Sequence, residues 1–306
     1  MSFAFIGCGL ASKFRAGFLD KNLIKYCYDT NQDAQKNFMK IFDCKGFDGL
    51  NFPTEVKSVF IGTPHAHLYP RARYCLQHGL NVCVEKPGAV RSSEIESLER
   101  LANELNAVCH IGYSISNTLY KNYDFSDLIH LKGYYAHGAR DKYDQEWRMQ
   151  NINSGSGVHY DLLSHLIHFS LLINSNVEYT LGHLDNLYWK CNAPDYAQVT
   201  LKNNALFDLS ANACDWKNRF DIHAVKKNSK ITINNLKSQT GYHDVTFFSS
   251  TGPGIVPIEK KIKQNINFWQ YDTNIFINKI LNKTKTNLFI ENKTLQIIER
   301  LNSNYG

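Results

Sequence analysis

Three residues of this sequence could move a proton or stabilise a negative charge. Asp161 and His165 are four positions apart in a segment of helical character, so both side chains would leave one helix face. A carboxylate placed there can orient an imidazole, which can act as acid or base near pH 7. Lys86 follows a short apolar run and precedes Pro87, which restricts Lys86 to an extended backbone. These residue types indicate general acid–base chemistry, with an ammonium group available as a compact donor.

Each candidate also has a simpler structural interpretation. Asp161 fits the first turn of a helix, and His165 fits a helix face packed on a sheet. Lys86 fits an ordinary strand–helix loop. A metal site built from these two helix residues with His159 and His168 is disfavoured, because the segment supplies no further acidic ligand. We therefore expect no metal.

A glycine turn lies near the start of the sequence, between a short apolar run and a helical segment. Gly7 would let the chain turn sharply, and Gly9 has no side chain to block a pyrophosphate. Ser12 is small enough for the helix to pack close to the strand. The amides of Leu10 and Ala11 would lie at the helix N-terminus, which favours phosphate groups. The pattern predicts a dinucleotide site.

Asp29 supports that prediction and indicates which dinucleotide binds. It ends the next apolar run, about 20 residues after the glycine turn, where an acidic residue can accept hydrogen bonds from the adenosine ribose. Its charge would repel a 2′-phosphate, and residues 30–33 offer no cation to bind one. We expect NAD, with NADP less favoured. The alternative, a glycine turn without a ligand, does not explain the position of Asp29.

The first half of the chain alternates between strand and helix patterns. Such alternation indicates right-handed βαβ units around a doubly wound parallel sheet of the Rossmann type. The expected strands are 3–6, 24–28, 58–61, 81–84 and 108–112, and the expected helices are 11–20, 31–41, 67–78 and 92–105.

Two pairs of residues lie directly beyond neighbouring strands of that sheet. Thr63 and Pro64 follow one expected strand, and Glu85 and Lys86 follow the next. The carboxyl ends of strands in an open parallel sheet border the ligand crevice, so we expect these residues to lie near the cofactor.

The second half is dominated by short strand patterns, several of which alternate apolar and polar residues. This favours a second α/β domain with a mostly antiparallel sheet. We expect a dinucleotide-binding domain over 1–116 and a second domain over 117–306. The expected strands are 128–137, 177–181, 187–191, 197–202, 205–211, 220–224 and 230–233, and the expected helices are 160–173, 267–281 and 292–302.

Composition limits the class of protein. The 306 residues are 43% hydrophobic and 20% charged, which suits a globular protein with substantial cores. The net charge of +6 comes from scattered residues, so we expect no nucleic-acid partner. No apolar stretch approaches the ~20 residues that span a bilayer, and no signal peptide is evident, so we expect no membrane partner. Eight cysteines without a Cys-x-x-Cys pair argue against zinc or a disulfide framework and favour the cytoplasm.

The motifs together resemble the Gfo/Idh/MocA oxidoreductases, the relatives of glucose–fructose oxidoreductase and inositol dehydrogenase. The resemblance implies a Rossmann domain followed by a domain whose large, open, mostly antiparallel sheet forms a homodimer or homotetramer. It also implies hydride transfer between nicotinamide and a hydroxyl-bearing carbon of a sugar, cyclitol or sugar nucleotide. The residues that carry it, in chain order, are Gly7, Gly9, Ser12, Asp29, Thr63, Pro64, Glu85, Lys86, Pro87, Trp147, Arg148, Gly157, Asp161 and His165.

The resemblance assigns roles to several of these residues. Lys86 would bind the reacting hydroxyl and help to position the nicotinamide. His165 would take the hydroxyl proton during oxidation, and Asp161 would hold His165 or contact a neighbouring hydroxyl. Trp147 and Arg148 would line the crevice that holds cofactor and substrate.

The sequence departs from the family pattern in three respects and leaves two alternatives open. Ser12 stands at the third position of the glycine motif, and the histidine that often follows Thr-Pro is either His67 or His65. The second domain is also short for the family. We expect His67 to contact the cofactor. The chain could instead be a dinucleotide-binding scaffold without catalysis, which retention of Lys86 and His165 disfavours. It could also be a reductase of C=C or C=N bonds, in which His165 would matter less.

Overall fold

The computed structural model describes residues 1–250, 255–303 and 305. The chain forms two compact units: Met1–Tyr113 with Trp269–Asn292, and Ser114–Phe268 with the residues from Lys293 onward. The expected division at residue 116 did not include this return of a C-terminal segment to the first unit. An aromatic contact explains the return, because fully buried Phe276 lies edge-on to Phe60 with ring centroids 5.4 Å apart.

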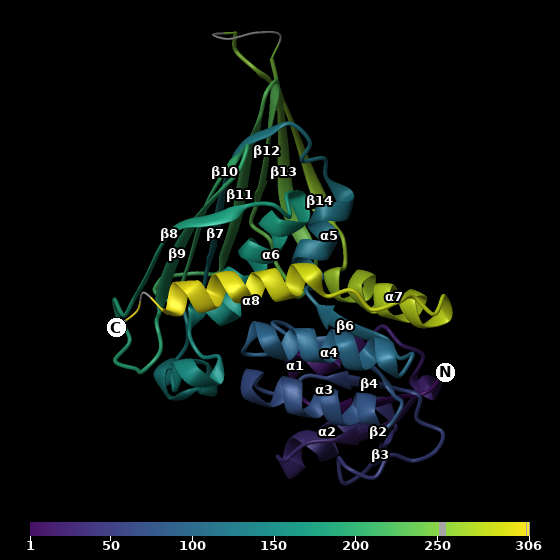
Figure 1. Ribbon diagram of the computed structural model, residues 1–306. Coiled ribbons are helices and arrows are strands. Elements are labelled where there is room, and N and C mark those ends of the chain that lie inside the picture. Colours follow the sequence, from purple (N-terminus) through teal and green to yellow (C-terminus); the bar gives the residue numbers. More distant parts are fainter. Residues whose placement is uncertain (251–254, 304, 306) are drawn as a thin grey trace. The chain divides into compact units, whose positions relative to one another are not determined.

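The first unit contains a six-stranded parallel sheet in the order β3-β2-β1-β4-β5-β6 (Figure 1). This is the strand order of a doubly wound Rossmann fold, so the predicted fold class of the first half is confirmed. The central strands β1 and β4 are buried at every position, which explains their continuous apolar sequences. The strands are β1 (Phe3–Ile6), β2 (Ile24–Tyr28), β3 (Lys45–Gly46), β4 (Ser58–Ile61), β5 (Asn81–Glu85) and β6 (Cys109–Gly112).

Two helices of this unit begin where side-chain hydrogen bonds favour a start. The Asn31 side chain accepts from the amides of Asp33 and Ala34, which caps the second helix. Glu94 accepts from the amides of Val90 and Arg91 at the start of the fourth helix. The helices are α1 (Leu10–Ala16), α2 (Gln32–Phe42), α3 (Leu68–Gln77), α4 (Ser92–Glu104) and α7 (Phe268–Leu281), with short 3₁₀ turns η1 (Lys21–Leu23) and η2 (His65–His67).

The second unit is built on an eight-stranded sheet in the order β14-β13-β12-β11-β7-β10-β9-β8. The pair β7 and β10 is parallel, and the other neighbours are antiparallel, as expected for a mostly antiparallel sheet. The strands are β7 (Leu128–Ala136), β8 (Glu178–Asp185), β9 (Tyr196–Lys202), β10 (Leu206–Asn212), β11 (Arg219–Lys226), β12 (Ser229–Asn234), β13 (Tyr242–Ser249) and β14 (Ile258–Asn265).

One buried helix packs on this sheet and carries the expected site residues. A single-turn π-helix, η6 (His159–Leu163), runs directly into α6 (Ser164–Ile173). A Cβ on Gly133 of β7 would lie 3.2 Å from Leu166, so the missing side chain permits close packing of α6. The other helical elements are α5 (Ser114–Asn122), η3 (Tyr143–Gln145), η4 (Trp147–Met149), η5 (Ile152–Ser154) and α8 (Phe289–Asn302).

The expected strand over 187–191 was wrong, because a buried carboxylate holds this segment as a loop. Asp195 is fully buried, and its two oxygens accept from the amides of Leu187, Tyr188 and Trp189 at 2.7–2.8 Å. These amides therefore cannot join a strand ladder. The strands β13 and β14 were not expected, and β14 is a polar, Lys-rich edge strand of the kind that lacks an apolar pattern.

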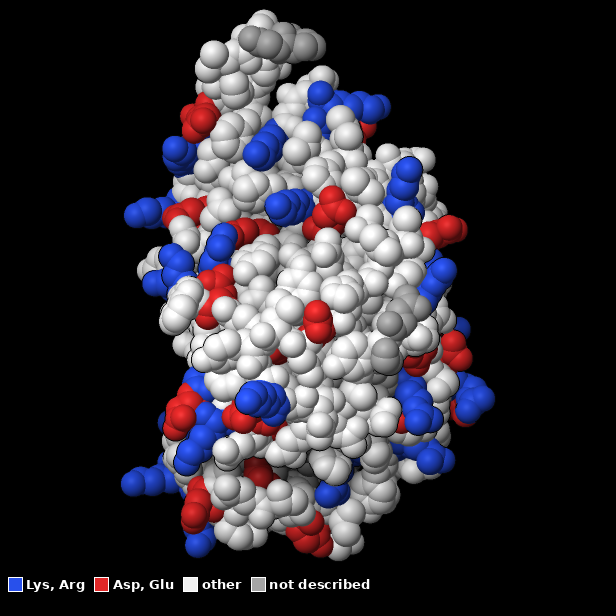
Figure 2. All heavy atoms as spheres, turned by 90° about the vertical axis from the view of Figure 1, so that its left-hand side faces the viewer, with Lys and Arg blue, Asp and Glu red and all other residues white. Residues whose placement is uncertain are grey.

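Charged side chains of both signs are interspersed over the face shown in Figure 2, without an extended stripe of one sign on that face.

Among the described residues, none of the helices has the combination of length and apolar character that crossing a bilayer requires.

Replacement of Asp195 tests the role assigned to its carboxylate. Asp195→Ala leaves three amides without their acceptor and should lower the free energy of unfolding by at least about 3 kcal/mol. The matched variant Asp185→Ala removes a carboxylate that is 48% exposed and should cost less than about 1 kcal/mol. Urea denaturation measures both, and equal losses would contradict the assigned role.

Candidate functional site

The glycine turn joins β1 to α1 and has the backbone geometry that only glycine tolerates. Gly7 has a φ of +87°, and a Cβ there would lie 2.6 Å from the Gly62 carbonyl oxygen. A Cβ on Gly9, by contrast, would meet nothing within 4 Å. The first helical hydrogen bond runs from the Lys13 amide to the Gly9 carbonyl, so the preceding amides lie at the helix N-terminus. The structure thus leaves Gly9 open to a ligand.

Ser12, the third position of the motif, lies at a close approach between α1 and the end of β4. Ser12 is 2% exposed, and a Cβ on Gly62 would lie 2.5 Å from its hydroxyl oxygen. A small residue at both positions therefore lets the helix lie against the strand, as expected of Ser12 from the sequence.

Asp29 is held beside the turn at the end of β2. One carboxylate oxygen accepts from the Cys8 amide at 2.7 Å, and the other accepts from the Asn31 amide at 2.8 Å. The side chain is half-buried, so its remaining lone pairs can reach a ligand. This geometry fits a ribose-binding carboxylate.

The other predicted cofactor residues follow the ends of adjacent parallel strands. Thr63 and Pro64 come after β4, and Lys86 comes after β5, at the same edge of the sheet as the glycine turn. In η2, His65 is 4% exposed whereas His67 is exposed, which leaves His67 the more accessible of the two.

Glu85, also predicted at the cofactor, has a partner that the sequence analysis missed. Its carboxylate lies 2.5 Å from Nε of Arg15, a buried residue of α1. Arg15 follows Ser12 by about one helical turn, so both residues lie on the face of α1 that packs on the sheet. This spacing was the signal that could have identified Arg15 as a buried residue.

In the second unit, Asp161 forms an ion pair with another predicted residue. Its Oδ2 lies 3.3 Å from Nε of Arg148, and both side chains are partly exposed. The guanidinium of Arg148 lies over the Trp147 ring, 4.4 Å from its centroid. The Gly157 amide donates to the Arg148 carbonyl at 2.6 Å, and the Ser156 hydroxyl donates to the Trp147 carbonyl at 2.6 Å. The Gly/Ser run therefore holds Trp147 and Arg148 beside Asp161.

His165 lies in α6, immediately after the π-helical turn that contains Asp161. Its ring is 5.8 Å from that of Tyr135, centroid to centroid, and the residue is 7% exposed. Single π turns are frequent at functional sites, because the i→i+5 spacing displaces the helix face locally. The two predicted catalytic residues are thus on one continuous helical segment, although the segment is not the regular α-helix expected.

The sequence analysis missed three residues whose pKa values respond to the charge of Asp161. Burial raises the pKa of Tyr135 and of Tyr143, and the charge of Asp161 raises both further. Burial lowers the pKa of His137. The negative charge of Asp161 raises this pKa, whereas the positive charge of Arg140 lowers it further. The Tyr143 hydroxyl lies 3.2 Å from Nε2 of His137. These residues come from β7 and the loop after it, and no spacing motif connects them to Asp161.

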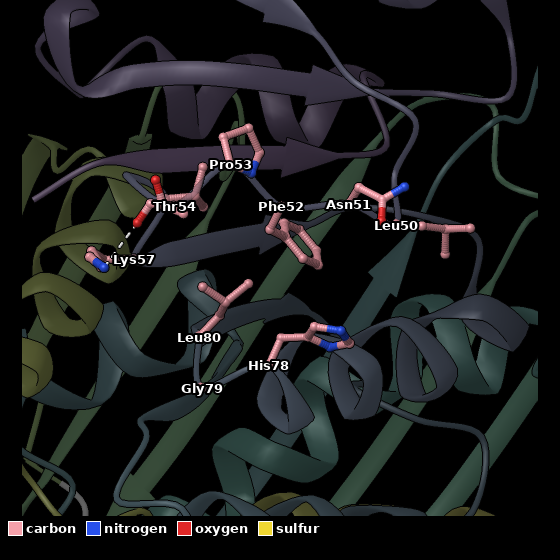
Figure 3. A pocket seen from close by; sticks show the side chains of 10 residues that line it. Leu50, Asn51, Phe52, Pro53, Thr54, Lys57, His78, Gly79 and Leu80 are labelled. Atoms are coloured by element: carbon pink, nitrogen blue, oxygen red, sulfur yellow. Dashed lines mark hydrogen bonds between the residues drawn. The ribbon is translucent and has the colours of Figure 1, made fainter.

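A pocket of about 350 Å³ in the first unit lies away from these residues (Figure 3). Phe52, Lys57, His78 and Leu80 are among its lining residues. Lys57 and Leu80 immediately precede β4 and β5, so the pocket is at the amino ends of these strands rather than the carboxyl ends. It is therefore distinct from the candidate dinucleotide site.

The contrast between Gly7 and Gly9 can be measured. Gly7→Ala should lower the free energy of unfolding by about 1–3 kcal/mol, because it combines a positive φ with a backbone clash. Gly9→Ala should change it by less than about 0.5 kcal/mol, because the space is open. It should nevertheless weaken dinucleotide binding, since the new methyl group occupies the approach to the turn. Thermal denaturation and NADH fluorescence titration report the two quantities, and unchanged NADH binding by Gly9→Ala would argue against this turn as the site.

Comparisons with known proteins identify the family. Residues 1–113 match the model of the GFO_IDH_MocA oxidoreductase family with its NAD-binding Rossmann fold, and residues 118–228 match the GFO/IDH/MocA C-terminal domain.

Curated relatives match over a shorter stretch. The oxidoreductase YdgJ of Escherichia coli is 31% identical over 123 residues, 36% of this chain and 33% of the relative. Glycosyl hydrolase family 109 protein 3 of Phocaeicola vulgatus is 26% identical over 127 residues, 38% of this chain and 23% of the relative. The matches thus span a third or less of the length of these curated relatives.

Solved structures share the fold over nearly the whole chain. UDP-N-acetylglucosamine 3-dehydrogenase from Acidithiobacillus ferrooxidans aligns with a TM-score of 0.82 at 17% identity, covering 98% of this chain and 96% of that one. Levoglucosan dehydrogenase in complex with NADH aligns with a TM-score of 0.81 at 14% identity, covering 99% and 97%. With both domain models matched in order, the chain belongs to the Gfo/Idh/MocA family of oxidoreductases, and its first domain is an NAD-binding Rossmann fold.

Proposed function

We propose that this protein is an NAD-dependent dehydrogenase or reductase that acts on a hydroxyl-bearing carbon of a sugar, cyclitol or sugar nucleotide. The observation that carries the proposal is the arrangement at the carboxyl edge of the parallel sheet. There an open glycine turn lies beside the anchored carboxylate of Asp29, and Lys86 follows a neighbouring strand. The names of the structural neighbours, dehydrogenases of levoglucosan and of a sugar nucleotide, support the substrate class.

The residues fit NAD better than NADP. Asp29 presents a negative charge where a 2′-phosphate would lie, and residues 30–33 include no lysine or arginine that could bind one. NAD, when bound, supplies or accepts the hydride. The turn residues Gly7, Gly9 and Ser12 would hold the pyrophosphate through backbone amides.

The chain's own residues would handle the proton and the developing charge. Lys86 would donate to the reacting oxygen and stabilise an alkoxide. His165 would take the hydroxyl proton during oxidation and return it during reduction. Asp161 would act on a neighbouring hydroxyl or on His165, while Arg148 holds the Asp161 carboxylate in place. Trp147, beneath the Arg148 guanidinium, would contribute an apolar wall for the cofactor or the sugar.

Asp29→Asn tests the cofactor preference. Loss of the charge should raise the Kd for NAD about tenfold, because charge-assisted hydrogen bonds are worth about 1.5–3 kcal/mol. The Kd for NADP should not rise, since repulsion of the 2′-phosphate is removed. Asp43→Asn, an exposed change at the opposite end of α2, is the matched control and should alter neither value. Calorimetric titration gives both constants, and equal weakening for NAD and NADP would contradict the role of Asp29.

Lys86→Ala tests the catalytic assignment. The variant should retain NAD binding but lose about 100- to 1,000-fold in kcat, as for removal of a single donor to a developing oxyanion. Lys57→Ala, at the opposite edge of the sheet, should leave kcat unchanged. The assay follows NADH formation over a panel of sugars, cyclitols and sugar nucleotides. Glycosides belong in the panel, with release of free sugar measured, because one curated relative is named a glycosyl hydrolase.

His165→Ala separates the proposed reaction from reduction of C=C or C=N bonds. Dehydrogenation of an alcohol requires a base for the hydroxyl proton, so kcat should fall about 100-fold or more and its pH profile should lose the inflection of an imidazole. Normal turnover in this variant would favour the other reductase class. A protein that binds NADH but turns over no member of the panel would be the non-catalytic scaffold. The homo-oligomer and the cytoplasmic location expected from the sequence stay predictions.

A further inference from the structure

A cluster of charged side chains lies in the first unit, and three of its five members are buried. It contains two cations, two carboxylates and one imidazole, from four elements that are distant in sequence. Its members are Arg15 of α1, Glu85 of β5, His110 of β6, and Asp272 and Lys279 of α7.

Arg15 is the centre of this cluster. It is 1% exposed, its Nε lies 2.5 Å from Oε1 of Glu85, and its Nη1 lies 2.8 Å from Oδ2 of Asp272. Its Nη2 donates to the Gly112 carbonyl at 3.5 Å. A planar guanidinium presents its donors in a fixed geometry and can hold two carboxylates in set positions, whereas an ammonium is a compact charge on a flexible stem. Arg15 therefore fixes Glu85 relative to the first turn of the dinucleotide-binding segment.

The remaining members complete the charge balance. His110 Nε2 lies 3.1 Å from Oδ1 of Asp272, and its Nδ1 lies 3.2 Å from Nζ of Lys279. The ammonium can only donate, so Nδ1 accepts and Nε2 carries the proton of a neutral ring. Burial lowers the pKa of His110, in agreement with the neutral form. Two positive and two negative groups then leave the cluster without net charge.

The backbone is shaped to admit Arg15. A Cβ on Gly112, at the end of β6, would overlap the guanidinium nitrogen Nη2. Cys83, His110 and Asp272 lie close enough to hold a metal ion, but Arg15 already pairs with Asp272, and burial raises the pKa of the Cys83 thiol. The cluster is therefore built for the guanidinium.

We propose that Arg15 is a positioning residue for Lys86, acting through Glu85. Glu85 is the last residue of β5, and Lys86 is the next residue in the chain. Holding the Glu85 side chain fixes the backbone from which the Lys86 side chain departs. Neutralising the Glu85 carboxylate also keeps it from attracting the adjacent ammonium. This inference rests on the proposed function, because Lys86 is the proposed catalytic donor.

Three variants disturb the cluster in different ways. Arg15→Lys keeps the positive charge but loses the planar arrangement of donors. Glu85→Gln keeps the shape of the side chain but loses its negative charge. Gly112→Ala displaces the guanidinium without changing any charge. The exposed pair Arg100 and Glu104 on α4 has the same residue types, with side chains 74% and 62% exposed. Arg100→Lys and Glu104→Gln are therefore the matched controls.

The first measurement needs no substrate. Lys86 is labelled with acetic anhydride in the NAD-loaded protein, and mass spectrometry compares its rate with that of Lys36, an exposed residue of α2. We expect Arg15→Lys and Gly112→Ala to slow labelling of Lys86 relative to Lys36 severalfold, because the released carboxylate attracts the ammonium. We expect the control variants to match the wild type. A folded Arg15→Lys or Gly112→Ala protein with the wild-type ratio would overturn the proposal.

The second measurement is steady-state kinetics on the substrate found by the panel. Misplacement of Lys86 should lower kcat by up to about 100-fold while KM and the Kd for NAD stay near wild type. A purely structural role would lower thermal stability without changing kcat per folded molecule, and that result would overturn the proposal. Glu85→Gln, which stays closest to the native shape, keeps this test available if another variant fails to fold. A wild type that turns over nothing, yet shows the labelling changes, would refute the proposed function and support the positioning role.

Discussion

The close approach of α1 to the central strands is the constraint on which the first unit depends. Gly7, Ser12 and Gly62 meet there, and a methyl group on either glycine would collide with the chain opposite. This contact turns the backbone amides at the start of α1 toward the carboxyl edge of the sheet. It also carries Arg15 into the interior, where the guanidinium meets Glu85 and Asp272. One steric requirement thus creates both an open anion-binding turn and a buried ion cluster.

In the second unit, a single carboxylate has a comparable role. Asp161 pairs with Arg148 and contributes to the shifted pKa values of Tyr135, His137 and Tyr143. Because these groups are largely buried, one charge influences several neighbours at once. The π-helical turn gives Asp161 a position different from that in a regular helix, and α6 continues directly into His165.

Sequence reasoning succeeded where one short-range physical factor dominates. The strands Phe3–Ile6 and Ser58–Ile61 were predicted at their exact bounds, because parallel strands buried on both faces must be apolar. It failed at 187–191, where the amides of an apolar segment are taken by Asp195. It also failed at β14, an edge strand whose polar sequence has no apolar alternation.

The sequence by itself determined the glycine turn, Asp29 and the alternation of strands and helices, because each depends on neighbouring residues or on a fixed local spacing. It also identified Lys86, Asp161 and His165 as the groups suited to proton chemistry. Only the tertiary structure decided which side chains surround them. Arg15 and Asp272 are 257 positions apart, and no local pattern marks a pair that forms when α7 returns to the first unit. A buried charge is stable only beside its partner, and the fold, rather than the spacing, brings that partner to it.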